Sequence, residues 1–198
     1  MRFFGEFTMD FSELAPARRT IRRFKQIPVP DSELRHIVDM ARHSSCASNK
    51  QPIRYVIIRE KELVKAVFET TRWAGMVAPR RTPEWGKNAP LAFIALCVPA
   101  DAGKFIDADA GAAIQSMEFA AWERGLGCCW FASFSPEKVQ ELINLDESKK
   151  VLYIVAVGFP DEFPEGEEAV DGEVAYYLDD ADTLHVPKLP TDEITTWL

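Results

Sequence analysis

The segment Arg18-Arg19-Thr20-Ile21-Arg22-Arg23-Phe24 places four arginines within seven residues of an otherwise acidic chain. Guanidinium groups bind phosphate through paired, charge-assisted hydrogen bonds, and the threonine adds a hydroxyl donor. If the segment is extended, Arg18, Thr20 and Arg22 share one face, and Arg19, Ile21 and Arg23 share the other. The first face would suit a phosphorylated ligand, while Ile21 anchors the second. The alternative is a solvated basic turn after a helix, because short charge runs usually lie at the surface.

The composition is that of an ordinary soluble globular protein, with 47% hydrophobic and 27% charged residues in a chain of 198. No apolar run reaches the roughly 18–20 residues that span a bilayer. The net charge of −8 argues against nucleic acid or an anionic membrane as a partner. Residues 1–10 are too short and too acidic for a signal peptide, so we expect a cytoplasmic protein with four reduced cysteines.

Several classes of active site lack support in the sequence. The three histidines form no H-x-x-x-H or H-E-x-x-H pair, so no metal site is predicted. The chain also lacks the G-x-S-x-G of a serine hydrolase, the G-x-G-x-x-G of a dinucleotide fold and a Walker-type loop. What remains favours a bound phosphorylated cofactor whose own chemistry does the work.

The charge is unevenly distributed along the chain. Residues 159–198 hold twelve acids and one base, Lys188, a net charge of −11; residues 1–158 hold 19 acids and 22 bases, a net charge of +3. We divide the chain into a core (1–158) and an acidic C-terminal arm (159–198). The arm is either disordered or wrapped around another surface, and its apolar residues, such as Tyr176, Tyr177 and Trp197, favour wrapping.

Hydrophobic patterns predict strands at about residues 54–59, 91–98, 128–132 and 151–157. They predict helices at about 61–70, 103–125 and 136–143, the second of which is rich in small residues. This alternation indicates an α/β or α+β fold.

Five motifs together resemble the nitroreductase family of FMN-dependent oxidoreductases. Residues 18–24 resemble its R-R-S-x-R-x-F opening, and S-C-A-S-N-K-Q-P (45–52) resembles its P-S-S-x-N-x-Q-P loop. G-L-G-C-C-W (125–130) resembles its G-L-G-x-C-W turn, and V-A-V-G-F-P (155–160) its late strand with G-[YF]-P. V-P-K (186–188) resembles its C-terminal phosphate-contacting element. The motifs follow the family's order across about residues 11–190.

The resemblance implies an α+β fold: a three-layer sandwich whose central, mainly antiparallel sheet is flanked by helices. It further implies an intertwined homodimer with two FMN molecules at the interface, each contacted by both chains. The core (1–158) would bind FMN, and the arm (159–198) would wrap around the partner subunit.

The resemblance also implies roles for individual residues. Arg18 and Lys188 would hold the FMN phosphate, with Arg19 and Thr20 at the phosphate–ribityl region. Arg22 would stabilise the negative charge of the reduced flavin near N1 and O2. The remaining predicted contacts with the flavin ring are Ser45, Cys46, Ala47 and Asn49 from the other chain, and Trp130, Ala132 and Ser133 on the opposite side, the last two through backbone N–H groups near N5 and O4.

Simpler readings of these residues stay open. Trp130 could be a core aromatic, Asn49 could bond within its own loop, and Lys188 could be solvated. We read Arg23 as a surface residue. Cys46 and Ala47 replace the family's usual serine pair. The second cation that often follows Lys188 is absent, and Arg80, Arg81 or Lys87 could replace it.

The predicted function is that of an FMN-dependent NAD(P)H oxidoreductase. Hydride would pass from NADH or NADPH through flavin N5 to a nitroaromatic, quinone or similar small-molecule acceptor, without a catalytic acid from the protein. One alternative is an FMN-binding electron-transfer or storage protein without turnover of its own. Another is a flavin-free scaffold whose arginines bind a phosphorylated partner. The acceptor stays open, and we expect residues 71–90 to influence it.

Overall fold

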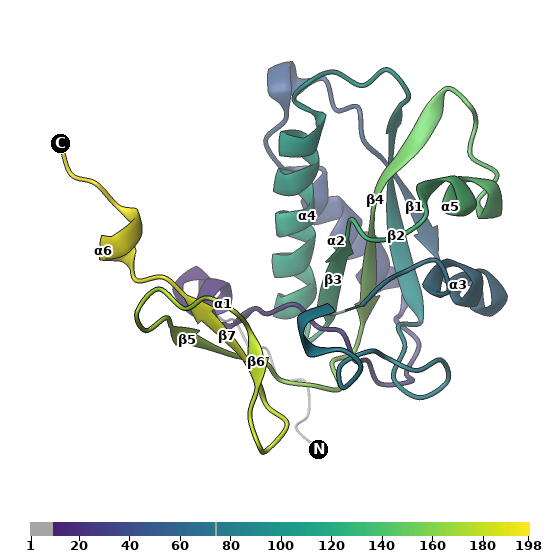
Figure 1. Ribbon diagram of the computed structural model, residues 1–198. Coiled ribbons are helices and arrows are strands. Elements are labelled where there is room, and N and C mark those ends of the chain that lie inside the picture. Colours follow the sequence, from purple (N-terminus) through teal and green to yellow (C-terminus); the bar gives the residue numbers. More distant parts are fainter. Residues whose placement is uncertain (1–9, 74) are drawn as a thin grey trace.

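The computed structural model describes residues 10–73 and 75–198. Its centre is a four-stranded antiparallel sheet in the order β1-β2-β4-β3 (Figure 1). The strands are β1 (Arg54–Ile58), β2 (Ala92–Pro99), β3 (Gly127–Phe131) and β4 (Lys149–Gly158). Strands β2 and β4 are buried almost throughout, because helices cover both faces of the sheet. This confirms the predicted α+β sandwich of three layers.

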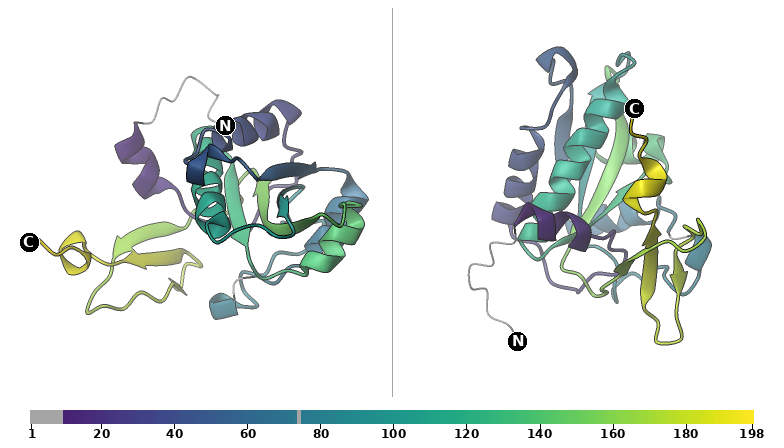
Figure 2. Two further views of the ribbon diagram at one scale, coloured as in Figure 1. Left: turned by 90° about the horizontal axis from the view of Figure 1, so that it is seen from above. Right: turned by 90° about the vertical axis from the view of Figure 1, so that its left-hand side faces the viewer.

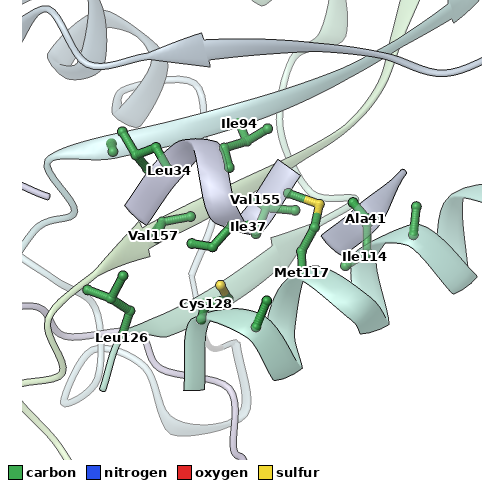
Figure 3. Packing of buried hydrophobic residues seen from close by; sticks show 14 of the residues in the cluster. Leu34, Ile37, Ala41, Ile94, Ile114, Met117, Leu126, Cys128, Val155 and Val157 are labelled. Carbon is green, nitrogen blue, oxygen red and sulfur yellow. The ribbon is translucent and has the colours of Figure 1, made fainter. Parts of the chain in front are cut away.

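Helices α2 (Asp31–Ala41) and α4 (Ile106–Glu123) cover one face. Their apolar side chains meet Ile94, Val155 and Val157 of the sheet in one buried cluster (Figure 3). The small residues of α4, including Ala110 and Ala113, are buried against this cluster. The predicted helix at 103–125 is therefore correct apart from its terminal residues.

Helices α3 (Lys61–Phe68) and α5 (Pro136–Leu142) cover the other face. An aromatic group strengthens this layer, and the rings of Trp73 and Phe131 meet edge-on at 4.5 Å. The remaining core elements are α1 (Phe11–Ala17) and the 3-10 turns η1 (Ala47–Asn49) and η2 (Gly75–Val77). Among the described residues, no helix has the length and apolar character needed to cross a membrane.

The arginine segment is an extended strip inserted at one end of the sheet. Ile21 and Phe24 have no solvent exposure. The Ile21 N–H donates to the Cys128 carbonyl at 2.9 Å, and Phe24 forms an isolated antiparallel bridge with Pro160. The prediction that Ile21 anchors the segment is confirmed, and the solvated-turn alternative is wrong.

Two glycines make room for these anchors. Gly127 and Gly158 lie opposite each other in the β3–β4 pair. A Cβ on Gly127 would lie 2.7 Å from the Ile21 Cβ, and a Cβ on Gly158 would lie 2.8 Å from the Phe24 Cδ1. Both separations are below van der Waals contact, so the glycines permit the segment to pack against the sheet.

The acidic arm forms a separate small sheet beside α1, in the order β5-β7-β6 (Figures 1 and 2). Its elements are β5 (Glu165–Glu168), β6 (Tyr177–Leu178), β7 (Leu184–Lys188) and the short α6 (Thr191–Ile194). The disordered alternative is therefore wrong. Ile194, Trp197 and Leu198 are exposed at its end. Wrapping around a partner stays a prediction.

Replacing Gly127 by alanine tests the contact between the segment and the sheet. The added methyl group would overlap Ile21, whose buried position leaves little room to move, so we expect Gly127→Ala to lower the free energy of unfolding by about 1–3 kcal/mol or more. Chemical denaturation measures the change. Gly103→Ala is the matched control, because nothing lies within 4 Å of its added Cβ. Equal stability of the two variants would contradict the packing described.

Candidate cofactor-binding site

A small cavity lies between the arginine segment and the acidic arm. Its volume is about 80 Å³, and we call it the cation cavity; its lining residues are Arg18, Arg19, Thr20, Arg22, Tyr176, Val186 and Lys188. None of these lining residues is acidic. The structure thus brings together the residues predicted to bind phosphate, including Lys188 from β7 at the far end of the chain.

Each arginine of the cavity is held by a different contact. The Arg18 Nη1 lies 3.3 Å from a carboxylate oxygen of Glu118 in α4. The Arg19 Nη1 donates to the Arg18 carbonyl at 2.6 Å, and its side chain crosses Gly166 of β5, where a Cβ would overlap the guanidinium. The Arg22 guanidinium lies 5.4 Å from the ring centre of Tyr176, within cation–π range.

These contacts correct the predicted alternation of faces. Alternation placed Arg19 on the face of Ile21, away from the ligand, whereas the family resemblance placed it at the phosphate–ribityl region; in the structure it lines the cavity together with Arg18. The cause is its hydrogen bond to the Arg18 carbonyl, which turns the guanidinium back toward β5. Strand-like alternation correctly predicts the direction of the Ile21 side chain but not that of Arg19.

The cavity carries positive charge that the chain itself does not fully offset. The Nε atoms of Arg18 and Arg19 are buried and have no hydrogen-bond partner. Burial, with a smaller contribution from Arg18, lowers the pKa of Arg19. Burial also raises the pKa of Glu118, an effect that Arg18 opposes. A phosphate would accept hydrogen bonds from the unpaired donors and, as a nearby anion, would oppose the lowering of the Arg19 pKa, so this set of residues fits the phosphate end of a nucleotide cofactor.

A buried carboxylate supports the backbone of the same segment. Glu162 accepts hydrogen bonds from the backbone N–H groups of Arg22 at 2.5 Å and Arg23 at 3.1 Å. Its other oxygen lies 3.2 Å from the Arg81 Nη1, and both of these side chains are almost fully buried. Sequence reasoning missed Glu162; its only signal is its position two residues after the G-F-P motif.

Asp182 in the arm forms ion pairs with three arginines. Its carboxylate lies 3.6 Å from Arg23, 2.8 Å from Arg80 and 3.5 Å from Arg81. Arg23 is therefore paired with the arm, although its side chain remains 25% exposed, so it lies at the surface as predicted but is not free. Arg81 is taken up by Glu162 and Asp182, so it does not serve as the second phosphate cation, and neither Arg80 nor Lys87 lines the cavity.

The predicted loop residues lie elsewhere in the same chain. The Ala47 N–H donates to Asp109 at 2.8 Å, and the Cys46 Sγ lies 3.4 Å from the same carboxylate. Asp109 precedes Glu118, the partner of Arg18, by nine residues of α4, or about 13.5 Å along the helix axis. Figure 1 shows η1 and α1 at opposite ends of α4. One chain therefore does not bring Ser45, Cys46, Ala47 and Asn49 to the cation cavity.

The internal hydrogen bonding of this loop follows the simpler alternative. The Asn49 Oδ1 accepts a bond from the Gln51 side chain at 2.9 Å. Asn49 and Gln51 have positive φ angles of 52° and 48°, a strained region for residues other than glycine. Asn49 is nevertheless exposed, so contact with a cofactor in another chain stays a prediction.

Trp130, Ala132 and Ser133 form a second exposed group at the end of the edge strand β3. The Trp130 side chain is 41% exposed and meets the Tyr153 ring edge-on at 5.1 Å, so it is not a core aromatic. The Ser133 carbonyl accepts a bond from the Arg72 N–H at 2.9 Å. None of the three lines the cation cavity. Their predicted place beside the flavin remains untested.

The three buried cysteines of the sheet, Cys97, Cys128 and Cys129, have poorly ionised thiols, because burial raises the pKa of each. Burial raises the pKa of Cys97 to about 11 and that of Cys129 to about 12. Such thiols are weak nucleophiles at neutral pH. In the described part of the chain, no group of three or more His, Cys, Asp or Glu residues could hold a metal ion.

Comparison with known proteins agrees with the predicted resemblance. The model of the nitroreductase family matches residues 15–159, most of the chain. The chain belongs to the nitroreductase family. A relative from Methanothermobacter thermautotrophicus, provisionally named NADH dehydrogenase/NAD(P)H nitroreductase, is 25% identical over 190 residues, which cover 91% of this chain and 88% of the relative.

Solved structures of the family share the fold. A nitroreductase family protein from Clostridium difficile is 22% identical with a TM-score of 0.69, covering 96% of this chain and 98% of its own. A variant of the FMN- and NADPH-dependent nitroreductase NfnB from Sphingopyxis sp. strain HMH is 18% identical with a TM-score of 0.71, covering 96% and 99%. At these identities the likeness establishes the fold alone.

The arm sheet beside the cavity should be sensitive to pH through His185. Hydrogen bonds to Glu167 of β5, and less to Asp179, raise the pKa of His185 above 6.5, and the Tyr177 ring stacks on it at 4.9 Å. Its stabilising contribution is therefore complete below pH 6.5 and is lost as pH rises through the raised pKa. We expect amide protection factors of β5–β7, corrected for intrinsic exchange, to fall as the pH rises above 6.5 through the raised pKa of His185. His185→Gln should abolish this fall, and an unchanged fall in the variant would assign it to other groups.

Proposed function

We propose that this protein is an FMN-dependent NAD(P)H oxidoreductase. The observation that carries the proposal is the cation cavity, where Arg18, Arg19, Arg22 and Lys188 converge without an acid in the lining. Bound FMN would supply hydride transfer at N5, from NADH or NADPH to an electrophilic acceptor such as a nitroaromatic or quinone. The cytoplasmic location remains a prediction from the sequence.

The cavity size supports binding of the phosphate end of the cofactor. Its volume of about 80 Å³ is far below the roughly 300–1,000 Å³ of typical ligand pockets. The phosphate would lie against Arg18, Arg19, Thr20 and Lys188. The flavin ring would extend beyond the cavity, past Arg22, whose guanidinium is held against Tyr176. Arg22 would then provide a fixed positive charge where the reduced ring is negative.

A homodimer would complete the site. Residues 45–49 and the cation cavity lie at opposite ends of α4, so one chain offers two separate parts of the predicted ring pocket. In a two-fold dimer each part can meet its counterpart from the partner. The exposed Trp197 and Leu198 give the arm an apolar end to bury against that partner.

The visible spectrum of the purified protein tests the proposal directly. After expression with ample flavin, we expect a yellow protein that releases FMN on denaturation. NADH or NADPH should bleach the bound flavin, and an added nitroaromatic or quinone should restore its colour. A flavin that NADH and NADPH fail to reduce would indicate a storage or electron-transfer protein. A colourless protein would contradict the FMN site altogether.

Arg22→Ala tests the role of the guanidinium. The backbone N–H of residue 22 can still bond Glu162, so the variant should fold. Loss of hydrogen bonds to a charged group, about 1.5–3 kcal/mol, corresponds to an FMN Kd raised about 10- to 100-fold, together with slower reduction. Arg35→Ala, on an exposed position of α2, is the control. Wild-type flavin content and reduction rate in Arg22→Ala would refute the assignment.

A further inference from the structure

Glu162 makes contacts that are unusual for a residue in an acidic, largely exposed arm. It is 6% exposed, and its two carboxylate oxygens serve different parts of the molecule. Oε1 accepts the backbone N–H groups of Arg22 and Arg23, while Oε2 faces the Arg81 guanidinium. The side chain therefore joins the arm to the arginine segment and to the segment that follows η2.

The two hydrogen bonds that Oε1 accepts fix the orientation of the backbone at Arg22. Two consecutive N–H groups that converge on one oxygen fix the orientation of both peptide planes. The two side chains then diverge. Arg22 lies on Tyr176 in the cavity wall, and Arg23 reaches Asp182. The Oε1 contacts thus sit directly behind the residue that faces the predicted ligand.

Arg81 has a different part in the arrangement. It neutralises a carboxylate that would otherwise be buried alone, and it also donates to the Asp182 backbone carbonyl. Arg81 does not line the cavity. Within the described part of the chain, its side chain bonds Glu162 and Asp182 and not Arg22. The Arg81–Glu162 ion pair therefore contributes to the stability of the fold, whereas the hydrogen bonds to Oε1 determine the orientation of Arg22.

We propose that Glu162 is a positioning residue for cofactor binding, which holds the backbone of Arg22 so that its guanidinium faces the cation cavity. This inference rests on the proposed FMN site. Glu162 does not touch the cofactor itself. Its effect on binding passes through Arg22, which makes it separable from a purely structural effect.

A double-mutant cycle tests the proposal on the full-length, FMN-loaded protein. The equilibrium Kd is obtained from the FMN fluorescence released on serial dilution. Glu162→Ala should raise the Kd about 10-fold in the wild-type background. In the Arg22→Ala background the same change should raise it less than about 2-fold, because the residue being positioned is gone. Equal effects in the two backgrounds, or an unchanged Kd in folded Glu162→Ala, would overturn the proposal.

Two conservative variants separate positioning from stability. Glu162→Gln retains an oxygen that can accept both backbone N–H bonds, and Arg81→Gln leaves those bonds intact, although each breaks the ion pair. Both should lower the melting temperature yet keep the FMN Kd within about 3-fold of the wild type. If Glu162→Ala does not fold, these variants decide alone. A 10-fold loss of affinity in folded Arg81→Gln would overturn the proposal.

The two possible failures are distinguishable. If the wild-type protein binds no FMN, or Arg22→Ala has no effect on binding, the proposed function itself fails. If the wild type binds FMN and Arg22→Ala weakens it, but the Glu162 variants do not follow the pattern above, only the positioning role fails.

Discussion

The packing of Ile21 and Phe24 against Gly127 and Gly158 is the constraint on which the candidate site depends. The two apolar side chains fill space that the two glycines leave open at one end of the β3–β4 pair. The arginines between and beside them are thereby held at a fixed place on the sheet. The arginine motif and the two glycine motifs, far apart in the sequence, are therefore complementary parts of one contact.

This contact holds several arginines close together. The positions of nearby acidic side chains determine which of the arginines keep an uncompensated positive charge. Two unit charges 4 Å apart interact by about 4 kcal/mol at an effective dielectric constant near 20, so each unpaired neighbour matters. Asp182 and Glu162 offset Arg23 and Arg81 on one side of the segment. On the other side Glu118 pairs with Arg18 alone. The positive charge is therefore concentrated in the cavity rather than spread along the segment.

The elements were accessible from sequence through local patterns, and the cavity through short motifs shared with a family. Continuous apolar runs identified β2 and β4, and the family resemblance identified the four cations and Thr20 of the cavity, but not Tyr176. The directions of the Arg19 and Arg23 side chains follow no such pattern, since they depend on a neighbouring carbonyl and on Asp182. Among twelve arm acids, local pattern offers no means of choosing the two that pair with distant arginines. Long-range ion pairs leave no periodic signal.

The length of α4 separates two groups of residues that were predicted to contact the cofactor. Its Asp109 end holds the loop containing Ala47, and its Glu118 end holds the cavity through Arg18. A rigid helix of 18 residues keeps these groups apart within one chain. Under the proposed function, the cofactor would reach both groups by lying between two chains, with each contributing opposite ends of its own helix. A two-fold axis satisfies this requirement twice with one interface, which favours two equivalent sites over a single shared one.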